Sequence, residues 1–298
     1  MSLRLLAPRY WPTWLGLGLL RLLAPLPTPL LQWFGKWLGR ALRHLPLGFV
    51  RIARRNLALC FPELTAADRE QLLRQHFASV GIALLETALA WWASDQRIQN
   101  LTEVQGQEHL DAALQHGKGA ILLSAHFTTL EIGARAMAAR LPLNIMYRPT
   151  KNEVMGRFLA RNRAQRTRRA IRRDDVRTLV TALKANEPVW YAPDQSYRNK
   201  GAQLVPFFGI PCASNTATSR LAKMTGAAVL PYFPERLSNG RYRMHILPAL
   251  DHFPSDDAIA DTERFHRLIE AQVRLYPEQY LWIHRRFKGL SKDYPNYY

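Results

Sequence analysis

The sequence predicts an α/β protein with a mixed, largely parallel sheet flanked by helices, preceded by an N-terminal membrane-anchoring helical segment. Short apolar runs that suit buried strands alternate with segments of helical periodicity along most of the chain. Polar side chains directly follow several of these runs. Residues 1–60 are apolar and basic and contain no Asp or Glu. These three observations together define the expected architecture.

The bulk composition indicates an anionic partner. The 298 residues include 41 Lys and Arg against 23 Asp and Glu, a formal charge of +18. Such a balance suits nucleic acid, an acidic membrane surface, an acidic protein or a phosphorylated substrate. Cys60 and Cys212 are too few for a disulfide framework and form no metal-ligand pattern. We therefore expect a reducing compartment and no cysteine nucleophile.

Residues 1–60 are predicted to be a membrane anchor. They carry nine Lys or Arg and the tryptophans Trp11, Trp14, Trp33 and Trp37. The apolar stretch 15–31 has about the length of a bilayer span, roughly 20 residues, but Arg21 and three prolines interrupt it. We expect a kinked span or an embedded helical element, followed by a basic amphipathic helix over 38–59. The alternative is a core helix of a soluble protein.

Residues 61–298 are predicted to form one catalytic domain. Apolar runs indicate strands over 120–125, 143–147, 188–192, 227–233, 241–247 and 280–284, and a strand or connector over 102–107. Helical periodicity indicates helices over 66–92, 108–116, 153–168, 176–186, 216–225 and 257–275, and a further helix from Leu130 onward. The alternation of the two kinds of segment is typical of a sheet covered by helices.

Four of the expected strands end in a polar side chain, namely His126, Arg148, Asp194 or His284. The carboxyl ends of parallel strands meet at one edge of a sheet, where ligands bind in open α/β folds. We therefore expect these four groups to lie close together around a site.

His126 and Glu131 are the strongest candidates for acid–base chemistry. On one continuous helix they would point about 140° apart, so they can meet only because the strand ends between them. A histidine oriented by a carboxylate can deprotonate a substrate hydroxyl. The alternative is that Thr128 and Glu131 form a capping box and His126 is a hydrogen-bonded histidine at the rim of the core.

Other enzyme classes lack their signatures. The chain contains no GxSxG elbow, no GxxxxGK[ST] loop and no GxGxxG fingerprint. Residues 148–177 carry eleven Lys or Arg, which could be a docking platform for anions or simply a solvated face. Nucleic acid is the rival partner for such a segment, but no helix-turn-helix, zinc module or RNA-binding strand is present.

The segment His126-Phe-Thr-Thr-Leu-Glu131 resembles the HX4(D/E) motif of glycerolipid-type acyltransferases. The chain more specifically resembles the late acyltransferases of lipid A biosynthesis, the lauroyl and myristoyl transferases. The resemblance covers nearly the whole chain. It includes Tyr-Arg-Pro at 147–149, Val-Trp-Tyr-Ala-Pro-Asp-Gln at 189–195, Val-Pro-Phe-Phe-Gly-Ile-Pro at 205–211 and Trp-Ile-His-Arg-Arg-Phe-Lys at 282–288.

This resemblance implies a bacterial inner-membrane enzyme with its catalytic domain on the cytoplasmic face. It would move a fatty acyl chain from acyl carrier protein to a hydroxyl of a lipid A precursor, Kdo2-lipid IVA or similar, without a metal, a cofactor or nucleic acid. Acylation of another glycolipid or of a lysophospholipid stays an alternative. A non-catalytic basic protein that binds membranes or nucleic acid is the alternative from another class.

The resemblance also implies roles for individual residues. By motif, His126 would be the general base and Glu131 its partner, with Arg163 and Asp194 also needed for activity. The remaining candidates, expected to bind the substrate, are Arg148, Gln195, His284, Arg285 and Arg286.

Overall fold

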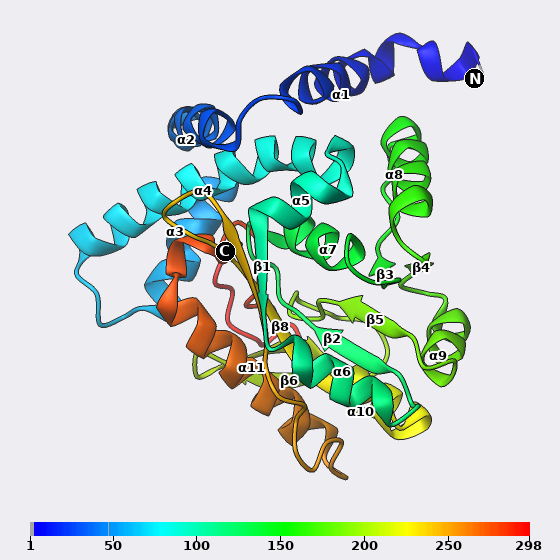
Figure 1. The fold of residues 1–298 in the computed structure, drawn as a ribbon. Coiled ribbons are helices and arrows are strands. Elements are labelled where there is room, and N and C mark those ends of the chain that lie inside the picture. The colour runs from blue at the N-terminus through cyan, green and yellow to red at the C-terminus, as the bar shows by residue number, and fades with distance from the viewer. Residues whose placement is uncertain (1–2, 47) are drawn as a thin grey trace.

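A seven-stranded sheet forms the centre of the computed structural model, which describes residues 3–46 and 48–298 (Figure 1). Its strand order is β1-β9-β8-β2-β5-β3-β4. The five strands from β8 to β4 are parallel to one another, whereas β9 is antiparallel to β8 and parallel to β1. The strands are β1 (Thr102–Gln105), β2 (Ala120–Leu123), β3 (Asn144–Tyr147), β4 (Arg169–Arg172), β5 (Pro188–Tyr191), β8 (Ala228–Arg236) and β9 (Tyr242–Ile246). The predicted mixed, largely parallel sheet is confirmed.

Helices cover both faces of the sheet. They are α1 (Trp11–Leu23), α2 (Thr28–His44), α3 (Gly48–Cys60), α4 (Ala66–Trp92), α5 (Asp95–Leu101), α6 (Gln107–Gln115), α7 (Leu130–Ala138), α8 (Glu153–Arg166), α9 (Val176–Lys184), α10 (Ala217–Thr225) and α11 (Ala258–Leu275). Short 3-10 turns occur at Leu3–Leu6, Pro8–Tyr10 and η3 (Pro277–Gln279).

The central strand β2 explains why the sheet lies at the core. All four of its residues are buried, and they alternate between two apolar clusters. Ile121 and Leu123 pack with α3, α10 and α11, whereas Ala120 and Leu122 pack with α6 and α7. A strand that is covered on both faces gives a continuous apolar run, as this sequence does. Helix α4 contributes residues to both clusters.

The N-terminal helices differ from the predicted arrangement. Instead of one helix over 38–59, α2 ends at His44 and α3 begins at Gly48. Pro46 lies between them; proline has no N–H to donate and restricts the residue before it, so a helix ends readily there. Leu47 is outside the described residues. Among the helices described here, none has both the length and the apolar character needed to cross a bilayer.

Helices α2 and α4 cross at close range through glycines. A Cβ atom on Gly35 would meet the backbone of Ile82, and one on Gly39 would meet the carbonyl oxygen of Phe77. In return, a Cβ on Gly81 would meet the backbone of both α2 glycines. Because glycine has no side chain, the two backbones can approach each other directly at these positions. Helix α2 is therefore packed closely against α4.

Several elements differ from the prediction. The segment 280–284 is not a strand, because only Tyr280 forms an isolated bridge, with Phe127. A hairpin of β6 (Ala202–Phe207) and β7 (Ile210–Asn215) was not predicted. In the structure, Phe208 and Gly209 form its turn and both have positive φ. The edge strand β4 and the short helix α5 were also missed.

Candidate active site

A large pocket opens at the carboxyl edge of the parallel strands. His126 follows β2, Arg148 follows β3 and Asp194 follows β5, so parallel strand direction brings all three to one edge. The pocket has a volume of about 940 Å³, a size typical of ligand sites. His126, Glu131, Arg148, Arg163, Gln195 and His284 all line it.

His126 is held by a buried carboxylate. Its Nδ1 lies 2.6 Å from Oδ1 of Asp194, and its backbone N–H donates to Oδ2 of the same residue at 3.0 Å. The hydroxyl of Tyr280 donates to Oδ2 at 2.9 Å. Asp194 is buried, whereas the His126 side chain is partly open to the pocket. The result is a chain of three side chains that ends at the pocket wall.

The protonation states in this chain follow from the contacts. Burial alone would raise the pKa of Asp194, but the charge of His126 and hydrogen bonds from His126 and Tyr280 outweigh it and hold the pKa well below its usual value. An ionised carboxylate can only accept hydrogen bonds, so Nδ1 of His126 carries the proton. In the neutral imidazole, the other ring nitrogen, Nε2, is then the one that can accept a hydrogen bond from a substrate.

Glu131 does not orient His126, which corrects the predicted pairing. Its Oε1 accepts a hydrogen bond from Nε1 of Trp91 at 2.8 Å, and within the described chain the carboxylate nearest to His126 Nδ1 belongs to Asp194. The capping-box alternative is also not realised, because Thr129 is the N-cap of α7 and makes no side-chain cap bond. Glu131 therefore lines the same pocket as His126, with one carboxylate oxygen bonded to Trp91.

The turn after His126 is fixed by a buried polar network. The hydroxyls of Ser79 and Thr128 lie 2.7 Å apart, and Nη1 of Arg236 donates to Ser79 at 2.8 Å. Arg236 also makes a bidentate ion pair with Glu86, at 2.7 and 2.6 Å. Gln32 of α2 donates to the same carboxylate at 3.4 Å. The network thus connects α2, α4 and the end of β8 to the turn that carries the histidine.

The segment after η3 lies along the same turn. The N–H of Thr128 donates to the carbonyl of Gln279 at 2.6 Å, and the N–H of Leu281 donates to the carbonyl of His126 at 2.9 Å. Although the predicted strand is absent, these bonds bring His284 to the pocket. Its Nε2 accepts the Ser196 N–H at 3.1 Å, and burial is the main cause that lowers its pKa to about 4. His284 is therefore neutral near pH 7.

The other basic candidates have different surroundings. Arg163 lies with its Cζ 4.7 Å from the ring centre of Tyr147, and Arg148 is exposed at the pocket mouth. Arg286 is buried and donates to Ser214 and to the carbonyl of Ala213, so it lies in the core rather than on the pocket wall. Arg285 lies over the ring of Tyr298, 5.9 Å from its centre, and also does not line the pocket.

The pocket is strongly cationic. Among the described residues, Glu131 is the single carboxylate on its wall. The basic side chains on that wall are Arg135, Arg148, Arg163, Arg166, Arg173, Arg220 and Lys288. Of these, only Arg135 has a carboxylate partner in the described chain, Asp95. Such a wall attracts anionic groups, and its effect is strengthened by the low-dielectric surroundings of a cleft.

Sequence reasoning missed two residues that shape this site. Tyr280 lies within an apolar run that we assigned to a strand, and nothing in its spacing links it to Asp194. Trp91 ends a long helix and has the appearance of a packing residue, yet its N–H binds Glu131. Both contacts join segments far apart in the sequence, and a local pattern carries no signal for them.

Comparison with known proteins agrees with this geometry. Residues 1–289 match the family described as bacterial lipid A biosynthesis acyltransferase. The chain is 38% identical to the lipid A biosynthesis lauroyltransferase of Escherichia coli K12, over 100% of this chain and 98% of the relative. It is 39% identical to the palmitoleoyltransferase of the same organism (96% and 94% covered) and 28% identical to its myristoyltransferase (94% and 88%). The resemblance drawn from the motifs is thereby confirmed, and this chain belongs to the bacterial lipid A biosynthesis acyltransferase family.

Proposed function

We propose that this protein transfers a fatty acyl group from the thioester of acyl carrier protein to a hydroxyl of a lipid A precursor such as Kdo2-lipid IVA. The observation that supports this best is the His126–Asp194 pair, with Nε2 free at the wall of a cationic pocket. The catalytic roles of His126, Glu131, Arg163 and Asp194 are part of this proposal. Relatives named lauroyl-, palmitoleoyl- and myristoyltransferase support a fatty acyl donor.

The proposed step is direct transfer between the two substrates. Nε2 of His126 takes the proton of the acceptor hydroxyl as its oxygen attacks the thioester carbonyl carbon. The C–S bond then breaks, and the departing thiolate takes the proton back from the imidazolium, leaving an ester and a free thiol. Within the described residues, no serine or cysteine side chain is hydrogen-bonded to His126, which favours this route over an acyl-enzyme.

The pocket offers suitable walls for both parts of the substrates. On α7, Leu130, Ala134 and Ala138 recur at four-residue steps and face the pocket opposite Ile145. This apolar strip starts beside Glu131 and extends about 12 Å along the helix, from a rise of 1.5 Å per residue. We assign the acyl chain to this strip. Arg148, Arg163 and Arg166 also line the pocket, have no carboxylate partner in the described chain, and suit the phosphates of a lipid A precursor.

Attachment to the cytoplasmic face of the bacterial inner membrane is also part of this proposal. Helices α1 and α2 expose a series of large apolar side chains, which include Trp11, Leu15, Leu19, Leu22, Leu30, Trp33, Phe34 and Trp37. An amphipathic helix of this kind embeds its apolar face at the level of the lipid headgroups. Basic side chains on the same segment, such as Arg40, suit an anionic leaflet.

The experiment that tests the function is mass spectrometry of purified Kdo2-lipid IVA after incubation with the protein and a mixture of acyl carrier protein thioesters. We expect one acyl group to be added by the wild type and none by His126→Ala of equal thermal stability. A lysophospholipid and phosphatidylinositol mannoside serve as competing acceptors in the same mixture. Acylation of either in preference to the lipid A precursor, or full activity of His126→Ala, would contradict the proposal.

A further inference from the structure

Helices α9 and α10 form one side of the pocket mouth and expose apolar side chains there. On α10, Ala217, Arg220, Leu221 and Met224 recur at three- and four-residue steps, and all four line the pocket. Met224 is 52% exposed, and Val176 at the start of α9 is 48% exposed. Large apolar side chains so open to solvent at the entrance of a site indicate a surface that a partner covers.

Unpaired arginines surround these apolar side chains. Arg173, Arg177 and Arg220 are exposed, and in the part of the chain that the structure describes none of them has a carboxylate partner. The two nearest acids are already engaged, since Asp174 pairs with Arg172 and Asp175 accepts the N–H of Thr178 as the cap of α9. The three arginines outnumber the acids that remain beside them, so among the described residues this surface carries a net positive charge.

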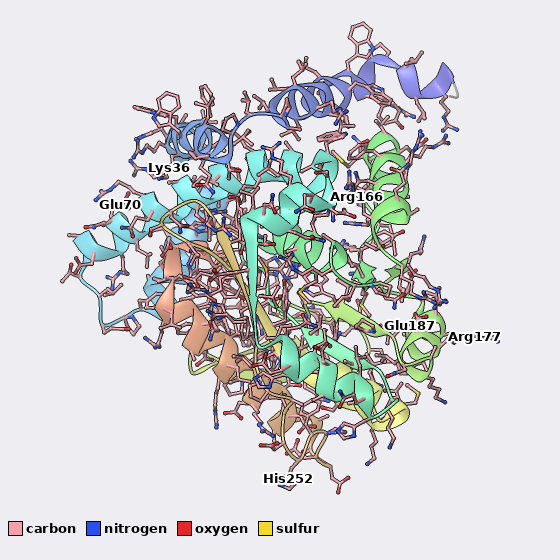
Figure 2. The ribbon with its side chains drawn as sticks, viewed as in Figure 1. Lys36, Glu70, Arg166, Arg177, Glu187 and His252 are labelled. Atoms are coloured by element: carbon pink, nitrogen blue, oxygen red, sulfur yellow. The ribbon has the colours of Figure 1, made fainter. Side chains whose placement is uncertain are left out.

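The position of this surface separates it from the proposed membrane face. In Figure 1, α1 and α2 lie along one side of the molecule, and α9 and α10 lie in the opposite half. Figure 2 shows Arg177 at the outer edge of the molecule, far from Lys36 on α2. A water-soluble partner can therefore reach α9 and α10 without occupying the face formed by α1 and α2.

We infer that Arg173, Val176, Arg177, Arg220 and Met224 form a docking surface, the α9–α10 surface, for an acidic carrier protein that delivers the acyl thioester. This inference rests on the proposed function and adds where its donor binds. An apolar centre of Met and Val surrounded by arginine is the composition of a protein–protein contact rather than of a site for one phosphate. Charge complementarity would accelerate encounter and fix the orientation of the carrier, whose acyl-bearing arm then enters the pocket toward His126.

The test combines kinetics and binding for Arg220→Glu, with Arg74→Glu as the matched control. Arg74 is exposed on α4, does not line the pocket and has no ion pair in the described chain. The donor is offered either as an acyl carrier protein thioester or as the same acyl group on pantetheine, which has no protein surface. We expect Arg220→Glu to raise the KM for the carrier protein thioester, divided by the KM for the pantetheine thioester, at least tenfold. Arg74→Glu should leave this ratio unchanged.

Direct binding separates this inference from the proposed function. The Kd of holo acyl carrier protein, measured by fluorescence anisotropy, should be at least tenfold higher for Arg220→Glu than for the wild type. The wild-type Kd should also rise steeply with salt concentration, because salt screens the attraction between the charges. Carrier binding without any acyl transfer would support the docking surface while contradicting the proposed function. The inference is overturned if the wild type does not bind the carrier, or if Arg220→Glu changes neither the ratio of the donor KM values nor the Kd of the carrier. It is also overturned if Arg220→Glu raises the KM of the glycolipid acceptor instead.

Discussion

Nδ1 of His126 lies 2.6 Å from Oδ1 of Asp194, a residue 68 positions later in the chain. The two follow neighbouring parallel strands, β2 and β5, which place them at the same edge of the sheet. Asp194 has a second anchor in Tyr280, so its orientation is fixed from both sides. This arrangement makes Asp194 the group that sets the tautomer of the histidine, a role that the sequence motif suggested for Glu131.

Replacing Asp194 with Asn should reduce kcat roughly 10²–10⁴-fold. The amide can donate to Nδ1, which would move the proton to Nε2 and remove the acceptor that the substrate hydroxyl needs. Steady-state kinetics with a carrier-bound donor measure the loss. Tyr280→Phe, which keeps the ring and removes one hydrogen bond to the carboxylate, should cost far less. Equal losses for the two variants would count against the tautomer argument.

Replacing Glu131 with Ala should lower the rate by roughly 10²-fold or more while leaving the folded state nearly as stable. The carboxylate lines the pocket and makes no cap bond at the start of α7, so its removal affects the reaction more than the helix. Kinetics and urea unfolding of the same preparation separate the two effects. A normal rate combined with a loss of stability would instead assign Glu131 a structural role.

The stability of the protein should fall as the pH drops from about 6.5 to about 4. His76 is completely buried, and burial is the main cause that lowers its pKa from 6.5 to about 4. Below pH 6.5 the unfolded chain protonates this histidine and the folded chain does not, which favours unfolding by up to roughly 3 kcal/mol. Above pH 6.5 both states are neutral, so the stabilisation is fully present.

Urea unfolding at several pH values between 7 and 4 measures this slope. In His76→Gln the slope should be shallower, because glutamine can still bond the carbonyl of Glu278 but does not titrate. His284 and His266 also have lowered pKa values and should account for part of the slope that remains. An identical slope in the variant would show that His76 does not contribute.

Gly39→Ala should destabilise the protein by about 2 kcal/mol or more. The new methyl group would meet the carbonyl oxygen of Phe77, and backbone cannot move aside as a flexible side chain does. Gly18→Ala is the matched control, because a Cβ there has open space within helix α1. It should be neutral or stabilising by up to ~1 kcal/mol. Urea unfolding of both variants checks the close crossing of α2 and α4.

Replacing Trp33 and Trp37 together with Asp should release the protein from vesicles of anionic and neutral phospholipid. The two side chains are 53% and 54% exposed on α2, where they would lie among lipid headgroups. Co-sedimentation at low and high salt measures the bound fraction. Leu275→Asp is the control, since this residue is 72% exposed on α11 but lies outside α1 and α2. Wild-type binding that disappears entirely in high salt would indicate electrostatic attachment instead.

The parts of the structure with local periodicity were predictable. The buried run of β2 and the polar groups after β2, β3 and β5 indicated both the sheet and the edge at which the pocket opens. Helices α4 and α11 also agree closely with their predicted ranges. Each of these features depends on residues within one segment, so its signal is contained in the order of neighbouring side chains.

The remaining features depend on contacts between distant segments. Strand β4 has the sequence Arg-Ala-Ile-Arg, and its charges are acceptable only because it lies at the edge of the sheet. The apolar run 280–284 suggested a strand, but its hydrogen bonds go to the turn after His126. The motif suggested Glu131 as the partner of that histidine, whereas the order of the strands brings Asp194 to it from 68 positions later in the chain.

Segment 279–284 returns to the turn at His126–Thr128 and is bonded to it. The geometry of the site therefore depends on residues more than 150 positions after the histidine. Tyr280, His284 and the backbone of Leu281 all contact groups around the histidine, yet a single β-bridge is the only sheet pairing described for this stretch. Trp282 of the same stretch is among the largest fully buried side chains, and Asn56 of α3 donates to the carbonyls of Trp282 and His284, so the core holds this segment in place. On warming, catalytic turnover and the circular dichroism signal of the helices should therefore be lost together.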